Sequence, residues 1–147
     1  MNKSMKILII DDRQPDLDEL VELLNSDYGI ETAMSDGQAL KAASASPPPH
    51  LILLGLRKTE SEGFDLCRRL KANPTARDIP LILLVSDTDS DLNAKGLELG
   101  AVDCIIKPVS PQLFKARIKT HLVLGAREIE LRQAYKQIED LNKRSEM

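Results

Sequence analysis

Aromatic residues are scarce in this chain of 147 residues, where they make up 3% of the sequence and tryptophan is absent. Hydrophobic residues nevertheless reach 42%, so the core of a folded domain must be built from aliphatic side chains. Since most domains have about 100–150 residues, the length predicts one domain with a short extension.

Basic residues are not in excess, and long apolar runs are missing. The formal net charge is −3, whereas binding to nucleic acid requires a concentrated basic surface, so we expect protein partners and no direct nucleic-acid binding. No apolar run approaches the ~20 residues that a membrane-spanning helix needs, and Met1–Ser4 does not begin a signal peptide. We therefore expect a cytoplasmic protein without a membrane segment.

Cysteine is also rare. The two cysteines, Cys67 and Cys104, are too few and too far apart for a disulfide framework or a zinc site. We expect both to be buried free thiols, because cytosolic thiols stay reduced and pack as small apolar groups.

Short aliphatic runs alternate with longer amphipathic segments. Runs that are apolar on both faces are typical of parallel strands covered by helices on both sides, and four such runs are Lys6–Ile10, Leu51–Leu54, Leu81–Val85 and Cys104–Ile106. Ile30–Met34 is a weaker candidate for the second strand.

The segments between these runs have the apolar spacing and the end signals of helices. They are Pro15–Asn25, Gly37–Ala45, Phe64–Lys71, Leu92–Leu99 and a fifth that begins near Ser110–Pro111. Five strand–helix units in succession predict an α/β protein with a doubly wound parallel sheet and right-handed crossovers.

The fifth helix is predicted to continue beyond the domain. Leu124, Leu131 and Ile138 share one heptad position, and Ala134 and Leu141 share another, which Arg127 interrupts. This pattern, with charges on the remaining positions, resembles about three heptads of a coiled coil. A single helix folded back on the sheet, or a frayed tail, is the alternative. We therefore expect a domain over residues 1–123 and a helical extension over 124–147, through which the protein forms a homodimer.

Polar residues follow the predicted strands at the edge where ligands bind in such folds. The first strand is followed by Asp11 and Asp12, the fourth by Ser86, and the fifth by Lys107. Paired carboxylates suit a hard cation such as Mg²⁺, and a lysine with a hydroxyl suits a phosphoryl group.

The segments KILIIDD, LILLGLRKTESEGFDLCRRLKANPTARDIPLILLVS and GAVDCIIKP resemble the receiver domain of bacterial response regulators over about residues 5–123. The resemblance implies a flavodoxin-like fold with five parallel strands in the order 2-1-3-4-5 and five helices, the last of them extended. It also implies a place in a two-component phosphorelay, where a histidine kinase phosphorylates an aspartate at the end of the third strand.

The resemblance assigns a role to each residue at the strand ends. Asp11 and Asp12 match the acidic pair that holds Mg²⁺, and the backbone carbonyl of Arg57 matches a further metal ligand. Ser86 matches the switch hydroxyl and Lys107 the lysine, both of which contact the phosphoryl group. The peptide bond from Lys107 to Pro108 corresponds to the cis bond of the family.

Three departures from the family pattern affect its chemistry. Gly55 stands at the position of the phosphate-accepting aspartate, and of the loop pattern that follows only Gly63 is kept. Cys104 occupies the position of the aromatic switch residue. With one carboxylate lost we expect Mg²⁺ binding to be weak, and Lys107 is then free to pair with Asp12 instead.

Other side chains are weak candidates for the phosphoacceptor. Glu60 and Glu62 are predicted to lie in a loop that points to solvent, and phosphoryl transfer depends on positioning. His50 precedes a strand and His121 lies within a helix, so both are interpreted as surface or packing residues.

The sequence leaves two functions open. One is a pseudo-receiver, meaning a receiver domain without phosphate control that acts as a regulatory module and binds a partner protein through its fourth or fifth helix. The other is an ordinary phosphorylatable response regulator in which the acceptor aspartate has been substituted. A histidine kinase or another signalling protein is the expected partner, and an output domain is expected beyond residue 147. An enzyme on the same fold is not expected, because a glycine-rich phosphate loop and a nucleophile elbow are missing.

Overall fold

The computed structural model describes residues 4–55, 60–85, 90–107 and 110–145. In this part of the chain five parallel strands form one sheet in the order β2-β1-β3-β4-β5. The strands are β1 (Lys6–Ile10), β2 (Gly29–Ala33), β3 (Leu51–Gly55), β4 (Leu81–Val85) and β5 (Asp103–Ile106).

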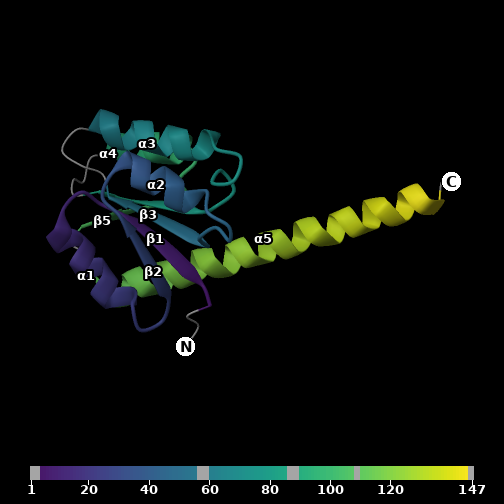
Figure 1. The fold of residues 1–147 in the computed structure, drawn as a ribbon, viewed down its shortest axis with the longest axis horizontal. Coiled ribbons are helices and arrows are strands. Elements are labelled where there is room, and N and C mark those ends of the chain that lie inside the picture. The colour runs from purple at the N-terminus through teal and green to yellow at the C-terminus, as the bar shows by residue number, and fades with distance from the viewer. Residues whose placement is uncertain (1–3, 56–59, 86–89, 108–109, 146–147) are drawn as a thin grey trace.

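Helices cover both faces of the sheet (Figure 1). α1 and α5 lie on one face, and α2, α3 and α4 lie on the other. Within the described residues their bounds are α1 (Gln14–Leu24), α2 (Asp36–Ala43), α3 (Glu60–Ala72), α4 (Ser90–Glu98) and α5 (Pro111–Ser145).

Each face of the sheet has its own aliphatic core. Alternate residues of a strand point to opposite faces, so Leu8 and Ile10 pack towards α2 and α3, while Ile7 and Ile9 pack towards α1 and α5. The central strands β3 and β4 are buried along their whole length. The predicted aliphatic core is confirmed, and it holds the carboxyl ends of β1, β3, β4 and β5 in fixed positions along one edge.

Local signals placed most element ends correctly. Gly100 follows α4 with a φ of 106°, the left-handed conformation that closes a helix, and Ala101 N donates to Gly96 O at 3.1 Å. The prediction was wrong at the start of α3, which begins at Glu60 rather than Phe64. Acidic residues favour the first turn of a helix, so Glu60 and Glu62 extend the helix and do not lie in a loop.

The helix α5 is the largest departure from a compact shape. It has 35 residues, which corresponds to about 50 Å at 1.5 Å per residue. Phe114, Ile118 and Leu122 are buried against the sheet, and the helix then continues away from the body in one direction (Figure 1). The alternative of a helix folded back on the sheet is therefore wrong. Over the described residues, none of the helices combines the length and apolarity needed to span a membrane.

Candidate functional site

Three residues meet at the carboxyl edge of the sheet: Asp11, Gly55 and Lys107. Asp11 directly follows β1, and its backbone N–H donates to Ala33 O at 3.1 Å, which continues the pairing with β2. Gly55 ends β3 and is paired in register with Leu84. Lys107 directly follows β5, and its N–H donates to Val85 O at 2.7 Å. Parallel strand pairing therefore brings these residues together, as the sequence predicted.

The side chain of Asp11 is buried and engaged through both oxygens. The residue is 3% exposed, its Oδ2 lies 3.3 Å from Lys107 Nζ, and its Oδ1 accepts a hydrogen bond from Arg13 N at 3.1 Å. A buried carboxylate is costly unless it is paired and hydrogen-bonded. The ammonium group and the backbone N–H supply both requirements.

A second carboxylate completes the arrangement. Asp16, in the first turn of α1, places its Oδ2 3.5 Å from Lys107 Nζ and 3.8 Å from Arg13 Nε. Lys107 thus bridges Asp11 and Asp16. Asp12 is exposed, and its predicted pairing with Lys107 stays a prediction. Asp16 and Arg13 were not among the predicted site residues. The only hint was an acidic residue in the first turn of the helix that follows β1.

The carboxylate of Asp11 occupies the space beside Gly55. A Cβ atom added at Gly55 would lie 2.4 Å from Asp11 Oδ2 and 2.9 Å from Asp11 Cγ. Both distances are well inside van der Waals contact, so any other residue at position 55 requires Asp11 to move. The glycine and the present position of Asp11 are therefore mutually dependent.

Several predicted site residues lie outside the described part of the chain. These are Arg57, Ser86 and Pro108. Their roles as metal ligand, switch hydroxyl and cis proline stay predictions.

The residues at this edge do not fit a tightly bound Mg²⁺. The described residues include no group of three acidic, histidine or cysteine side chains able to hold a metal ion. Of the predicted ligands, Asp11 already has an ammonium group on one oxygen and an N–H group on the other. A cation would have to share Asp11 with Lys107, whose positive charge repels it, and also give up water, which Mg²⁺ does reluctantly.

We expect Mg²⁺ to bind weakly or not at all at millimolar concentration, because Lys107 already neutralises Asp11. Titration followed by the NMR shifts of the Asp11 and Asp12 amides measures this, with the amide of the distant Asp140 as the reference for non-specific effects. Saturation of the two site amides at micromolar Mg²⁺ would contradict the expectation.

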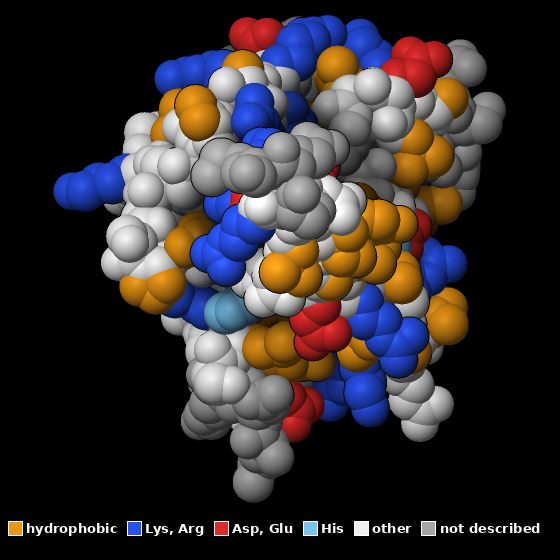
Figure 2. Space-filling model, turned by 90° about the vertical axis from the view of Figure 1, so that its right-hand side faces the viewer, with side chains coloured by type: hydrophobic (Ala, Val, Ile, Leu, Met, Phe, Trp, Pro, Cys, Tyr) orange, Lys and Arg blue, Asp and Glu red, His pale blue; other side chains and the backbone are white. Residues whose placement is uncertain are grey.

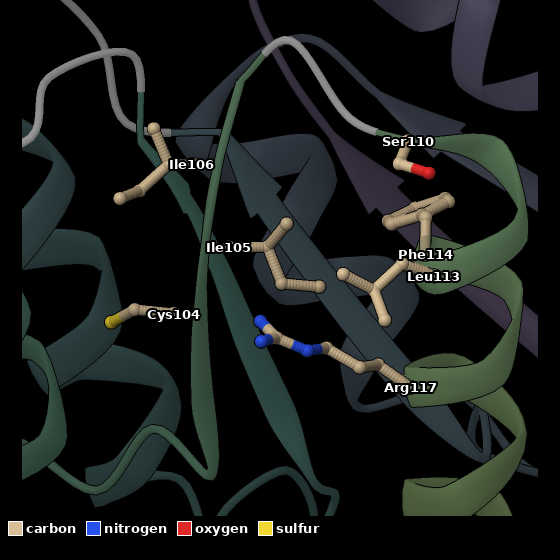
Figure 3. Close-up of a pocket in the computed structure, with 7 residues that line it drawn as sticks. All are labelled: Cys104, Ile105, Ile106, Ser110, Leu113, Phe114 and Arg117. Carbon is tan, nitrogen blue, oxygen red and sulfur yellow. The ribbon is translucent and has the colours of Figure 1, made fainter.

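The predicted switch position, Cys104, belongs to a different environment. Its side chain points away from α5 (Figure 3) and packs against the core on the other face of the sheet, beside Gly96 of α4. Burial raises the pKa of this thiol, and the neighbouring Asp103 and Cys67 add to the rise. Cys67 is fully buried, whereas Cys104 is only partly buried, so the expectation of two buried thiols holds for Cys67 alone.

An open cleft of about 330 Å³ lies between β5 and α5. Figure 3 shows Ile105 and Leu113 facing each other across it, with Arg117 reaching from α5 towards the strand. Arg117 Nη1 lies 3.8 Å from Asp103 Oδ1, and His121 Nε2 lies 3.2 Å from Asp103 Oδ2. His121 is therefore held by a side-chain contact within the fold, which agrees with its interpretation from the sequence as a surface or packing residue.

The chain is similar to known signalling proteins. The family model of the response regulator receiver domain matches residues 7–119. The chain is 34% identical over 134 residues to Response regulator PleD of Caulobacter vibrioides, with 89% of this chain and 29% of that protein covered. It is 37% identical over 116 residues to a protein of Vibrio cholerae named "Probable cyclic di-GMP phosphodiesterase", with 79% and 26% covered. The chain therefore spans less than a third of the length of these two relatives.

The fold is also similar to solved structures. A CheY-like response regulator receiver domain protein from Methanospirillum hungatei JF-1 superposes with a TM-score of 0.74 at 25% identity, covering 84% of this chain and 98% of that one. The predicted flavodoxin-like fold with strand order 2-1-3-4-5 is confirmed.

Proposed function

This chain belongs to the response regulator receiver domain family, and we propose that it is a pseudo-receiver: a cytoplasmic regulatory module that binds signalling proteins without being phosphorylated. The receiver domain of a two-component system transfers phosphate to its own aspartate. Gly55 has no carboxylate at the matching position, so the domain has no acceptor there.

The packing of Asp11 beside Gly55 is the main support for this proposal. Asp11 Oδ2 lies 2.4 Å from the point where a Cβ at position 55 would be, and Lys107 Nζ lies 3.3 Å from the same oxygen. The lysine that would contact a phosphoryl group is thereby engaged with Asp11 and Asp16. Lys107 and Arg13 together balance the charges of Asp11 and Asp16, so the ammonium group is already engaged by carboxylates of this chain.

We expect no acyl phosphate to form on this protein. Acetyl phosphate with Mg²⁺ is incubated with the purified chain, and the intact mass is recorded before and after treatment with hydroxylamine. A phosphorylatable receiver domain serves as the positive control. A stoichiometric phosphoryl adduct that hydroxylamine removes would overturn the proposal.

A second candidate is an ordinary response regulator in which residue 55 is naturally aspartate. The observation that favours it is the retention of Asp11 and Lys107 at the ends of their strands. Phosphorylation by a histidine kinase would then be the native input. The codon for residue 55 in the natural gene separates the two candidates directly.

We further propose that the extension over residues 124–147 makes a homodimer and leads to an output domain beyond residue 147. Figure 2 looks along α5 from its C-terminal end, and hydrophobic side chains gather along one side of the projecting helix. The seam consists of Leu124, Leu131, Ile138 and Leu141, which are each more than half exposed in the single chain. A second copy of the same helix has the matching heptad pattern.

A further inference from the structure

Within the part of the chain that the structure describes, the projecting part of α5 also approaches the turn that joins α3 to β4. This α3–β4 turn comprises residues 73–80, and a groove of about 490 Å³ separates part of it from α5. Gly125, in the interior of α5, faces Pro80 at the end of the turn. A Cβ added at Gly125 would lie 3.5 Å from Pro80 Cγ and 3.9 Å from Pro80 Cδ. This is ordinary van der Waals contact, so a methyl group fits between helix and turn, and a larger side chain must extend into the groove or displace the helix.

An ion pair joins the same turn to the next part of the helix. Arg132 Nη1 lies 3.7 Å from Asp78 Oδ2, and Arg132 Nη2 donates to Glu128 Oε1 at 2.6 Å. Glu128 lies one helical turn before Arg132 and holds its guanidinium group in place. An exposed ion pair is weak by itself, but this one acts beside the contact of Gly125 with Pro80 and therefore opposes rotation of the helix about that contact.

The backbone of the turn that carries Asp78 is fixed by hydrogen bonds from α3. Lys71 Nζ, from the last turn of α3, donates to Arg77 O at 3.2 Å and to Ile79 O at 3.1 Å. These are the carbonyl groups on either side of Asp78. Lys71 is half-buried, and burial lowers the pKa of its ammonium group. Lys71 therefore fixes the backbone from which the Asp78 carboxylate projects.

We infer that the α3–β4 turn is a clamp that sets the direction in which α5 leaves the body, and so determines how the two bodies are placed in the dimer. The part of this inference that concerns two bodies rests on the proposed homodimer. The clamp itself is intramolecular and acts in a single chain. Glycine is disfavoured in the interior of a helix, and at position 125 it leaves α5 without a side chain where the helix faces Pro80.

The direction of α5 is measured by the distance between two spin labels in the full chain. One is placed at the exposed Glu22 of α1, and the other at the exposed Lys136 of α5, which lies off the seam. Attachment through an unnatural amino acid leaves Cys67 and Cys104 unlabelled. Labelled chains are diluted with excess unlabelled chains, so that only distances within one chain contribute.

We expect a narrow distance distribution for the unchanged protein and for Gly125→Ala. Gly125→Leu should shift the mean distance, because its side chain pushes the helix away from Pro80. Asp78→Ala and Arg132→Ala should each broaden the distribution, whereas Lys143→Ala, a matched loss of an exposed cation further along α5, should not. Circular dichroism confirms that each variant is folded, and Asp78→Ala, a surface change, tests the clamp even if Gly125→Leu does not fold.

A broad distribution in the unchanged protein would overturn the clamp. The clamp would also be overturned if the distance distributions of Asp78→Ala and Arg132→Ala were the same as that of Lys143→Ala. A narrow distribution in a chain that light scattering shows to be monomeric would instead refute the dimer and leave the clamp in place.

Discussion

Gly55→Asp is expected to destabilise the metal-free protein and to make its stability depend on Mg²⁺. A side chain at position 55 begins 2.4 Å from Asp11 Oδ2, so Asp11 must rotate away from Lys107 and Arg13. The loss of the ion pair and the hydrogen bond of a buried carboxylate costs about 1–3 kcal/mol, and the added carboxylate repels Asp11. Denaturant unfolding with and without Mg²⁺ measures both effects. Recovery of about 2.7 kcal/mol is expected at a Mg²⁺ concentration of 100 times the dissociation constant.

The same variant should also acquire reactivity towards acetyl phosphate. Asp11, Asp12 and the new carboxylate then form a three-acid cluster that suits Mg²⁺, and Lys107 lies close enough to contact a phosphoryl group. We expect a detectable adduct that forms slowly and that hydroxylamine removes. Little conformational response should follow, because Cys104 is a small thiol packed into the core where the family has an aromatic switch.

Gly55→Ala is the matched control, because its methyl group displaces Asp11 without adding charge. It should lose a similar amount of stability, regain none of it with Mg²⁺, and form no adduct. If Gly55→Asp binds no Mg²⁺ and takes no phosphate, the site has changed beyond one residue. That result would support the pseudo-receiver and exclude the second candidate function.

Truncation after Val123 is expected to convert a dimer into a monomer. It removes the seam formed by Leu124, Leu131, Ile138 and Leu141, and the burial of each such side chain contributes about 1.5–3 kcal/mol before ordering costs. Ile118 and Leu122, which belong to the core, remain, so the body should stay folded. Light scattering of both chains gives their masses, and equal monomeric masses would refute the dimer.

A pair of single substitutions tests the seam without shortening the chain. Leu131 and Ile129 have nearly the same exposure, 57% and 55%, but two residues along a helix lie on nearly opposite sides of it. Leu131→Asp should therefore give a monomer and Ile129→Asp a dimer. Monomers from both, or dimers from both, would show that the predicted seam is not the contact surface.

The sheet could be predicted from sequence because its strands carry their own signal. Leu51–Gly55 and Leu81–Val85 are aliphatic throughout, which only a strand buried on both faces requires. The second strand was a weaker candidate because β2 lies at the edge of the sheet and is mostly half-buried. Its polar Glu31 and Thr32 follow from that position.

For the site, the sequence predicts which residues lie at the ends of the strands, but not which side chains contact one another there. The convergence of Asp11, Gly55 and Lys107 follows from parallel pairing, which the pattern of elements implies. The choice of Asp16 as the second partner of Lys107 depends on where α1 docks, which no local signal encodes. That Asp11 fills the space beside Gly55 is likewise a result of packing between strands. The contacts of Asp78 with Arg132 and of Pro80 with Gly125 join residues more than 40 positions apart and could not be foreseen.

The straight path of α5 has a mechanical consequence. The part of the helix beyond Arg132, the last residue that contacts the α3–β4 turn, is about 20 Å long, so a tilt of about 10° at its base moves its tip by about 3.5 Å. Small adjustments in the packing of α5 on the sheet are thus amplified into displacements comparable to the width of a side chain. A domain attached to the C-terminal end of α5 would therefore be displaced by a change in the angle of the helix, without a direct contact with the receiver domain.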